Sequence, residues 1–230
     1  MSNSIFTMAE IPKDIRAVIF DMDGVIVDSE HLHYETDSRI FEHFCIMVQE
    51  QERHQFVGMS VQKFYETINL RYAPHLSPEY MIEFDRKYRA WFFRHAEVRA
   101  NDNLPVFLNQ LKNQKIKTAL ASGSSQELIE IILRKLNLLD SFEVVLSSER
   151  VPRPKPWPDV FLRTAKLLNT PPDQCMVIED SALGIKAANA AGMFSVGYKG
   201  ENGNHQDLSD ADLTIESFRS IISKFEYCIF

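Results

Sequence analysis

The chain has 230 residues, of which 45% are hydrophobic, and it carries 25 Lys and Arg against 32 Asp and Glu, a net charge of −7. A chain of this length and composition can bury a full globular core, in one domain or in a core with a smaller companion. The acidic balance argues against nucleic acid or an anionic membrane as a partner. The three cysteines, Cys45, Cys175 and Cys228, are scattered, the amino terminus does not resemble a signal sequence, and no apolar run is long enough to span a membrane. Together these features predict a cytoplasmic protein.

The first predicted element is a strand over the apolar run Ala17 to Phe20, of the kind that is buried on both faces inside a parallel sheet. It leads directly into Asp21-Met22-Asp23-Gly24, and ligands of open α/β sheets collect at the carboxyl ends of strands. Two crowded carboxylates repel each other, so either a cation joins them or one keeps its proton. This suits phosphoryl transfer, with Asp21 as the nucleophile and a neutral Asp23 as the acid, although the same residues alone are equally typical of a turn.

The next segment has helical spacing of its apolar residues. The pattern predicts a helix from Glu30 to about Gln49, a second after the break at residues 57–60, and a third that begins at Ser77-Pro78-Glu79. Three successive helices without a strand do not continue a βαβ repeat. We therefore expect an inserted helical domain over residues 29–99, within a core formed by residues 1–28 and 100–230.

Strands and helices alternate again after residue 103. A helix is predicted over residues 104–111, and strands over residues 116–121, 142–146, 175–178, 193–196 and 213–215, with a last helix from Glu216 to about Tyr227. Ser124, with Glu127 three residues later, has the spacing of a capping box and predicts a helix start. Gly192 is placed to end a helix with a left-handed residue.

Three further strand ends carry polar groups that agree with the first. Ser122-Gly123 precedes a predicted helix, whose free N-H groups suit a phosphate oxygen. Lys155 stands between two prolines that stiffen its backbone, so its ammonium can be directed at a phosphoryl group. Glu179-Asp180 follows another buried strand, and hard oxygen ligands at this edge favour Mg²⁺. Each of these signals also has an ordinary structural interpretation, as a cap, a turn or a surface lysine.

Taken in order, the four strand ends resemble the four motifs of the haloacid dehalogenase superfamily, and Val25-Ile26-Val27-Asp28-Ser29-Glu30 resembles its β-phosphoglucomutase-like branch. The resemblance implies a Rossmann-like doubly wound parallel sheet with an inserted α-helical cap. It also implies a Mg²⁺-dependent phosphatase that forms an aspartyl phosphate on Asp21, with Asp23 as acid and base. The implied phosphate contacts are Ser122, Gly123 and Lys155; the implied metal site comprises Asp21, the backbone carbonyl of Asp23, and Asp180, with Glu179 ordering its waters.

The favoured substrate is a small phosphomonoester such as a sugar phosphate, acted on by a monomer. A sugar-phosphate mutase is the main alternative, but where mutases carry Gly-x-Ser-Arg this loop reads Gly58-Met59-Ser60-Val61, and Val61 cannot hold a second phosphate. A phosphonate hydrolase is disfavoured because residues 29–56 contain no lysine. A phosphate-storing receiver or an inactive binding module fits the set of motifs less well. Glu30, His33, Met59 and Ser60 are the predicted substrate contacts.

Overall fold

The structure is a computed structural model that describes residues 11–53, 56, 59, 61–200 and 206–226. In this part of the chain six strands form one parallel sheet, in the spatial order β3-β2-β1-β4-β5-β6. The strands are β1 (Ala17–Phe20), β2 (Lys117–Ser122), β3 (Val144–Ser147), β4 (Cys175–Glu179), β5 (Phe194–Tyr198) and β6 (Leu213–Ile215). The predicted fold, a doubly wound parallel sheet, is confirmed.

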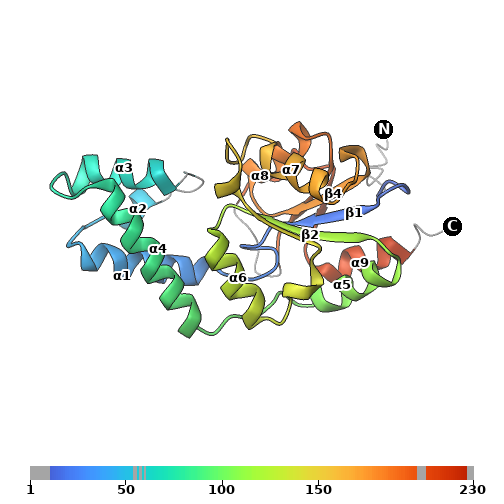
Figure 1. The fold of residues 1–230 in the computed structure, drawn as a ribbon, viewed down its shortest axis with the longest axis horizontal. Coiled ribbons are helices and arrows are strands. Elements are labelled where there is room, and N and C mark those ends of the chain that lie inside the picture. Colours follow the sequence, from blue (N-terminus) through green and yellow to red (C-terminus); the bar gives the residue numbers. More distant parts are fainter. Residues whose placement is uncertain (1–10, 54–55, 57–58, 60, 201–205, 227–230) are drawn as a thin grey trace, which may run out of the picture.

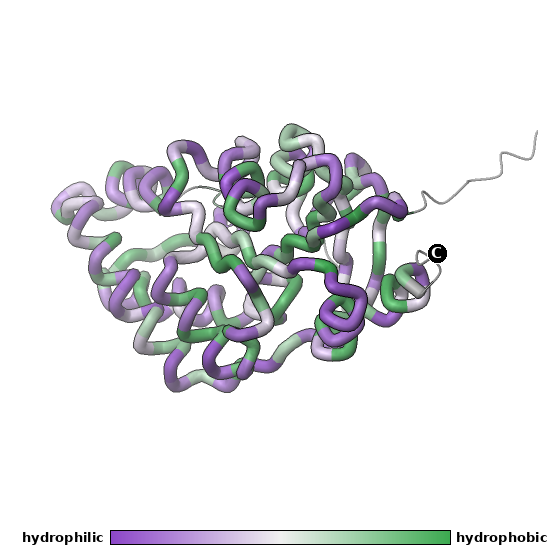
Figure 2. Tube along the Cα trace, turned by 45° about the vertical axis from the view of Figure 1, so that its right-hand side comes forward, coloured by the Kyte–Doolittle hydropathy of each residue, from purple (hydrophilic) through white to green (hydrophobic). Residues whose placement is uncertain are grey.

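Helices cover both faces of the sheet because side chains of each strand alternate between the faces. Val18 and Phe20 of β1 pack with α5 (Leu104–Asn113), α6 (Gln126–Lys135) and α9 (Phe218–Glu226). Ala17 and Ile19 pack with α7 (Asp159–Leu167) and α8 (Ala182–Ala190) on the other face. Figure 1 shows the two layers on opposite sides of β1 and β2, and Figure 2 shows apolar residues of the strands running between more polar helices.

A separate group of helices follows β1 at the carboxyl edge of the sheet (Figure 1). It consists of α1 (Glu30–His43), α2 (Glu50–Arg53), α3 (Val61–Tyr72) and α4 (Pro78–His95). These helices have their own apolar cluster, which includes Ile40, Phe41, Tyr65, Ile68 and Met81. We call this group the helical unit. Within the described residues, no helix combines the length and the apolar character needed to cross a bilayer.

Two predictions of local structure were wrong. The first helix ends at His43, not near Gln49, because Cys45 adopts a left-handed conformation (φ 54°) and the extra short helix α2 follows. The capping box at Ser124 does not form: Ser125 caps α6 by accepting a hydrogen bond from Leu128 N, and the Ser124 hydroxyl is used elsewhere. By contrast, Ser77 caps α4, and Gly192 ends α8 with φ 71°, as predicted.

The helical unit meets the core through α4 and α6. Arg94 of α4 forms an ion pair with Glu127 of α6 at 2.7 Å. Lys135 donates to the carbonyls of Arg94 and Ala96 at 2.9 and 2.6 Å, which satisfies acceptors left over at the end of α4. These contacts join the helical unit to the core near the returning linker.

Candidate active site

The parallel sheet brings the predicted strand ends together because β2, β1 and β4 are neighbours that point the same way. Asp21 follows β1, Ser122 ends β2, and Glu179 ends β4. Asp21 and Glu179 are almost fully buried, and Ser122 is fully buried. Acids and a hydroxyl from three strands therefore lie at one edge of the sheet, the edge that faces the helical unit (Figure 1).

Lys155 connects two of these acids. Its ammonium lies 2.5 Å from Asp21 Oδ1 and 2.5 Å from Glu179 Oε1, and it also lies 5.0 Å from the centre of the Phe161 ring. Burial lowers the pKa of Lys155, but the two carboxylates outweigh burial and hold the pKa above its ordinary value. Lys155 is therefore a fixed positive charge at this edge of the sheet.

At Asp21, burial outweighs the effect of Lys155, so the pKa of this carboxyl rises. Burial raises its pKa most strongly, Lys155 lowers it, and the charges of Glu179 and Asp23 raise it again, to about 7. The pKa of Asp180 is also well above its ordinary value, first through burial and then through the charges of Glu179 and Asp21. The site thus holds more negative charge than Lys155 alone can compensate.

Asp23 differs from the expectation that it keeps its proton. Its Oδ1 accepts hydrogen bonds from Ser29 at 2.6 Å and from His33 Nε2 at 2.8 Å, and its Oδ2 accepts one from Ser124 at 2.7 Å. Burial raises the pKa of Asp23, whereas the hydrogen bonds from His33, Ser29 and Ser124 lower it. With the helical unit in this position, these three donors favour the carboxylate form of Asp23.

The orientation of His33 depends on a residue that the sequence analysis missed. Arg89 Nη1 lies 3.0 Å from His33 Nδ1, and Arg89 also pairs with Asp37 at 2.6 Å and with Asp85 at 2.5 Å. A guanidinium can only donate, so His33 Nδ1 accepts, and the hydrogen on Nε2 is donated to Asp23. The only sequence signal for Arg89 is a charged residue between the aromatic positions of α4.

Two glycines permit the close approach of the acidic side chains. Gly24 has φ 79°, and a Cβ atom there would overlap the Asp180 carboxylate. A Cβ atom at Gly184 would overlap the Glu179 carboxylate, which accepts from Ser181 N at 2.7 Å and from Ser181 Oγ at 2.9 Å. At Gly123, in contrast, an added Cβ atom would meet no other atom within 4 Å.

The structure describes three of the four predicted substrate contacts. His33 lies in the site, Glu30 is exposed at the first position of α1, and Met59 is 38% exposed. Ser60 and Gly58 lie outside the described residues. Val61, the residue that stands in place of the mutase arginine, is 51% exposed at the start of α3.

The chain is similar in sequence to other proteins over most of its length. It is 33% identical over 210 residues to β-phosphoglucomutase of Bacillus subtilis, which covers 87% of this chain and 89% of that protein. It is 30% identical to hexitol phosphatase B of Escherichia coli, and the match covers 80% of this chain and 84% of that protein. It is 29% identical to the fructose-1-phosphate phosphatase of the same organism, and this match covers 78% of this chain and 94% of that protein.

Solved structures show the same architecture. The crystal structure of β-phosphoglucomutase from Clostridium difficile matches with a TM-score of 0.77 at 29% identity and covers 92% of this chain and 97% of that chain. CbbY from Rhodobacter sphaeroides, solved in complex with phosphate, matches with a TM-score of 0.83 at 20% identity and covers 92% of this chain and 99% of that chain. At this identity the match shows a shared fold only. The model of the family described as haloacid dehalogenase-like hydrolase matches residues 18–198, so the chain belongs to the haloacid dehalogenase-like hydrolases, in their β-phosphoglucomutase-like group.

Proposed function

We propose that the protein is a Mg²⁺-dependent phosphatase that hydrolyses a small phosphomonoester, with sugar phosphates as the favoured class. The observation that carries the proposal is the convergence of Asp21, Asp23, Lys155 and Glu179 at one sheet edge, with Lys155 bonded to two of the acids. The sugar-phosphate enzymes among the relatives support the substrate class.

In the proposed reaction Asp21 attacks phosphorus and forms an aspartyl phosphate, which water then hydrolyses. Lys155 bonds Asp21 Oδ1, so attack would use Oδ2, and the ammonium also offsets charge on the transferring group. Ser122, together with the backbone at Gly123, would bind phosphate oxygens. The loose transition state of phosphoryl transfer requires mainly positioning and electrostatic stabilisation of this kind.

Asp23 is the proposed acid for the leaving oxygen and the base for the incoming water. Its carboxylate form, stabilised by His33, suits the second role directly. A movement of the helical unit that withdraws His33 would remove one influence that lowers the pKa of Asp23. Burial, which raises that pKa, would then count for more, and Asp23 could carry the proton for the first role.

A divalent cation fits the acidic side chains. The carboxylates of Asp21 and Glu179 share the Lys155 ammonium, with those of Asp23 and Asp180 nearby. Burial first, and then the charges of neighbouring carboxylates, raises the pKa values of Asp21 and Asp180. No three acidic, His or Cys side chains of the described part converge into a complete protein-only metal site. Mg²⁺ needs only one or two carboxylates together with water and substrate phosphate. Asp21, Asp180 and the Asp23 carbonyl would hold it, with Glu179 in support, and it would supply positive charge to the phosphoryl oxygens.

We further propose that the helical unit, over residues 29–99, acts as a cap that closes over the substrate and excludes water. Its own apolar cluster and its direct contact with Asp23 through His33 support this role. The core would then comprise residues 1–28 and 100–230. A cytoplasmic location and a monomeric state stay predictions of the same proposal.

A sugar-phosphate mutase is the second candidate. The 33% identity to the β-phosphoglucomutase of Bacillus subtilis favours it, and the exposed apolar Val61 counts against it. In a mutase the phosphoryl group would return to the sugar instead of passing to water.

The deciding experiment is a screen of phosphorylated metabolites with and without Mg²⁺, followed by measurement of both phosphate release and isomer formation. Asp21→Asn is expected to lose at least about 10³-fold in kcat, while Asp28→Asn, which changes an exposed acid in the same segment, keeps the parent rate. Release of phosphate supports the phosphatase. Isomerisation of a hexose phosphate that requires a bisphosphate would establish the mutase instead, and full turnover by Asp21→Asn would overturn the proposed nucleophile.

A further inference from the structure

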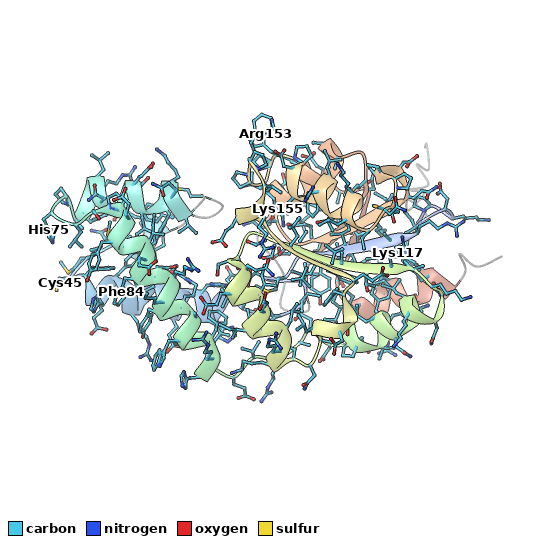
Figure 3. The ribbon with its side chains drawn as sticks, viewed as in Figure 1. Cys45, His75, Phe84, Lys117, Arg153 and Lys155 are labelled. Carbon is cyan, nitrogen blue, oxygen red and sulfur yellow. The ribbon has the colours of Figure 1, made fainter. Side chains whose placement is uncertain are left out.

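A hollow of about 290 Å³ lies at the amino edge of the sheet, opposite the candidate active site. Arg16 directly precedes β1, Lys117 begins β2, and Gln174 directly precedes β4, so adjacent parallel strands form its floor. Asp21 is five residues along the chain from Arg16, and an extended strand rises about 3.3 Å per residue, so the two places are about 16 Å apart. Figure 3 shows Lys155 at the end of the sheet that faces the helical unit and Lys117 toward the other end.

The charged side chains that line the hollow are all positive. They are Arg16, Lys115 and Lys117, and among the described residues none of the three pairs with a carboxylate and no acid lines the hollow. Other lysines of the described part, such as Lys112 and Lys166, also form no ion pair, so what distinguishes these three cations is that they line one hollow. The hollow is therefore a local concentration of uncompensated positive charge, which attracts anions.

Backbone hydrogen bonds fix the chain positions from which these side chains extend, although Arg16 and Lys115 are themselves exposed. Arg16 N donates to Gln174 O at 2.8 Å, and Lys117 N donates to Arg16 O at 3.0 Å, which locks the floor to the sheet. Lys117 Nζ donates to Leu168 O at 2.5 Å, which places its ammonium beside the end of α7 and leaves it two further N-H groups. A role in stabilising the end of α7 would explain Lys117, but it does not explain Arg16 or Lys115.

Three neutral hydrogen-bonding residues and Pro171 complete the lining. Asn169 and Thr170 come from the turn after α7, and Gln174 comes from the floor. Lys115 and Asn169 both have left-handed backbones, at φ 57° and 48°. Asparagine is common in that conformation but lysine is not, so at residue 115 the chain carries a long cation where glycine or asparagine would fit with less strain.

We propose that this hollow is a second anion site, which binds the phosphoryl dianion of a small molecule independently of the active site. Cations that extend from one edge of the sheet and from the turn beside it, together with neutral donors, match the oxygens of phosphate. The volume is close to the lower limit of small-ligand pockets, which suits a phosphate group better than a large cofactor. The bound group would be either free inorganic phosphate or the phosphate of a metabolite.

The test is a titration of the full chain with inorganic phosphate, followed by amide NMR at constant ionic strength set with chloride. Amides of Asn169, Thr170 and Gln174 report on the hollow, and those of Gly123 and Ser124 report on the active site, so the two kinds of binding are read separately. We expect saturable shifts at the hollow that remain in the Asp21→Asn variant. A parallel titration of the Asp21→Asn variant with a hexose phosphate distinguishes free phosphate from a phosphorylated metabolite as the ligand. If the hexose phosphate binds the hollow at least tenfold more tightly than inorganic phosphate, the ligand is a metabolite. If it binds equally or more weakly, the ligand is free phosphate.

Matched variants test whether the cations that line the hollow are responsible for phosphate binding there. Arg16→Gln combined with Lys115→Asn should weaken phosphate binding at the hollow at least tenfold and leave phosphatase activity unchanged. Lys112→Gln combined with Lys166→Gln removes the same charge from exposed residues of α5 and α7 that do not line the hollow, and should keep binding within twofold. If the double variant at the hollow does not fold, Lys115→Asn alone serves, with a loss of at least threefold. Shifts that do not saturate, or equal losses in both variants, would overturn the proposal.

Discussion

His33, in the first turn of α1, is hydrogen-bonded to Asp23, in the core, at 2.8 Å. This contact joins the helical unit to the proposed acid and base of the reaction. Because Arg89 donates to the other ring nitrogen, the neutral ring can present only its Nε2 hydrogen to Asp23. Arg89 is itself held by Asp37 and Asp85, and Asp85 also accepts a hydrogen bond from the buried Tyr65 at 2.9 Å.

The first prediction concerns Arg89. Arg89→Met should lower kcat by up to about 100-fold, because His33 is then free to adopt the other tautomer. The same change leaves two acids of the helical unit unpaired, which should cost about 3–5 kcal/mol of stability. Nitrogen-15 NMR of the His33 ring reads the tautomer directly, in protein shown by circular dichroism to be folded.

Arg86→Met is the control for that experiment, since Arg86 is an exposed residue of the same helix. If Arg89→Met is too unstable to purify, Arg89→Lys serves, because a single ammonium cannot reproduce the planar fork of the guanidinium. An unchanged His33 tautomer in the altered protein would show that Arg89 does not orient the ring.

The second prediction concerns Lys155. Lys155→Met should lower kcat by about 10²–10³-fold, the usual effect of removing one charged stabiliser from a phosphoryl site. It should also raise the pKa of Asp21 above about 7, because Lys155 lowers that pKa in the parent protein. The measurements are steady-state rates and the pH titration of the Asp21 carboxyl by carbon-13 NMR. Lys199→Met, at an exposed lysine, should change neither.

The third prediction uses two glycines as a matched pair. Gly24 and Gly192 have similar left-handed backbones, at φ 79° and 71°, so alanine should cost each about 1–2 kcal/mol of stability. Only at Gly24 would the new Cβ displace a side chain, the Asp180 carboxylate; at Gly192 it meets open space. Gly24→Ala should therefore lose Mg²⁺ binding and activity, while Gly192→Ala keeps both. Calorimetry with Mg²⁺ and rate measurements test the pair, and equal activities would show that the position of Asp180 is unimportant.

The sequence was sufficient for the core of the site because each motif is local. The position of Asp21 follows from the buried strand before it, and parallel strands bring Ser122 and Glu179 to the same edge. The partners of Asp23 were harder to predict. Arg89 reaches the site only through the packing of α1 against α4, which no local pattern reports. The spacing of Ser124 to Glu127 predicts a capping box, but the Ser124 hydroxyl donates to Asp23 and Glu127 pairs with Arg94.

The last prediction concerns the dependence of stability on pH in the metal-free protein. The pKa of Asp21 is raised from 3.8 to about 7, so between these pH values the folded state binds more protons than the unfolded state. The contribution of Asp21 to the free energy of unfolding should therefore fall as pH rises from about 4 to about 7, and stay low above that. Asp21→Asn removes this penalty, and at about 1.4 kcal/mol per pKa unit it should stabilise the metal-free protein at pH 8 by about 2–4 kcal/mol. Urea unfolding from pH 4 to 8 measures the difference, with the exposed Asp140→Asn as a control that should follow the parent. Parallel stability curves for the parent and Asp21→Asn would contradict the prediction, whereas curves that diverge as pH rises would show that the acids of this site lower stability when no cation is bound.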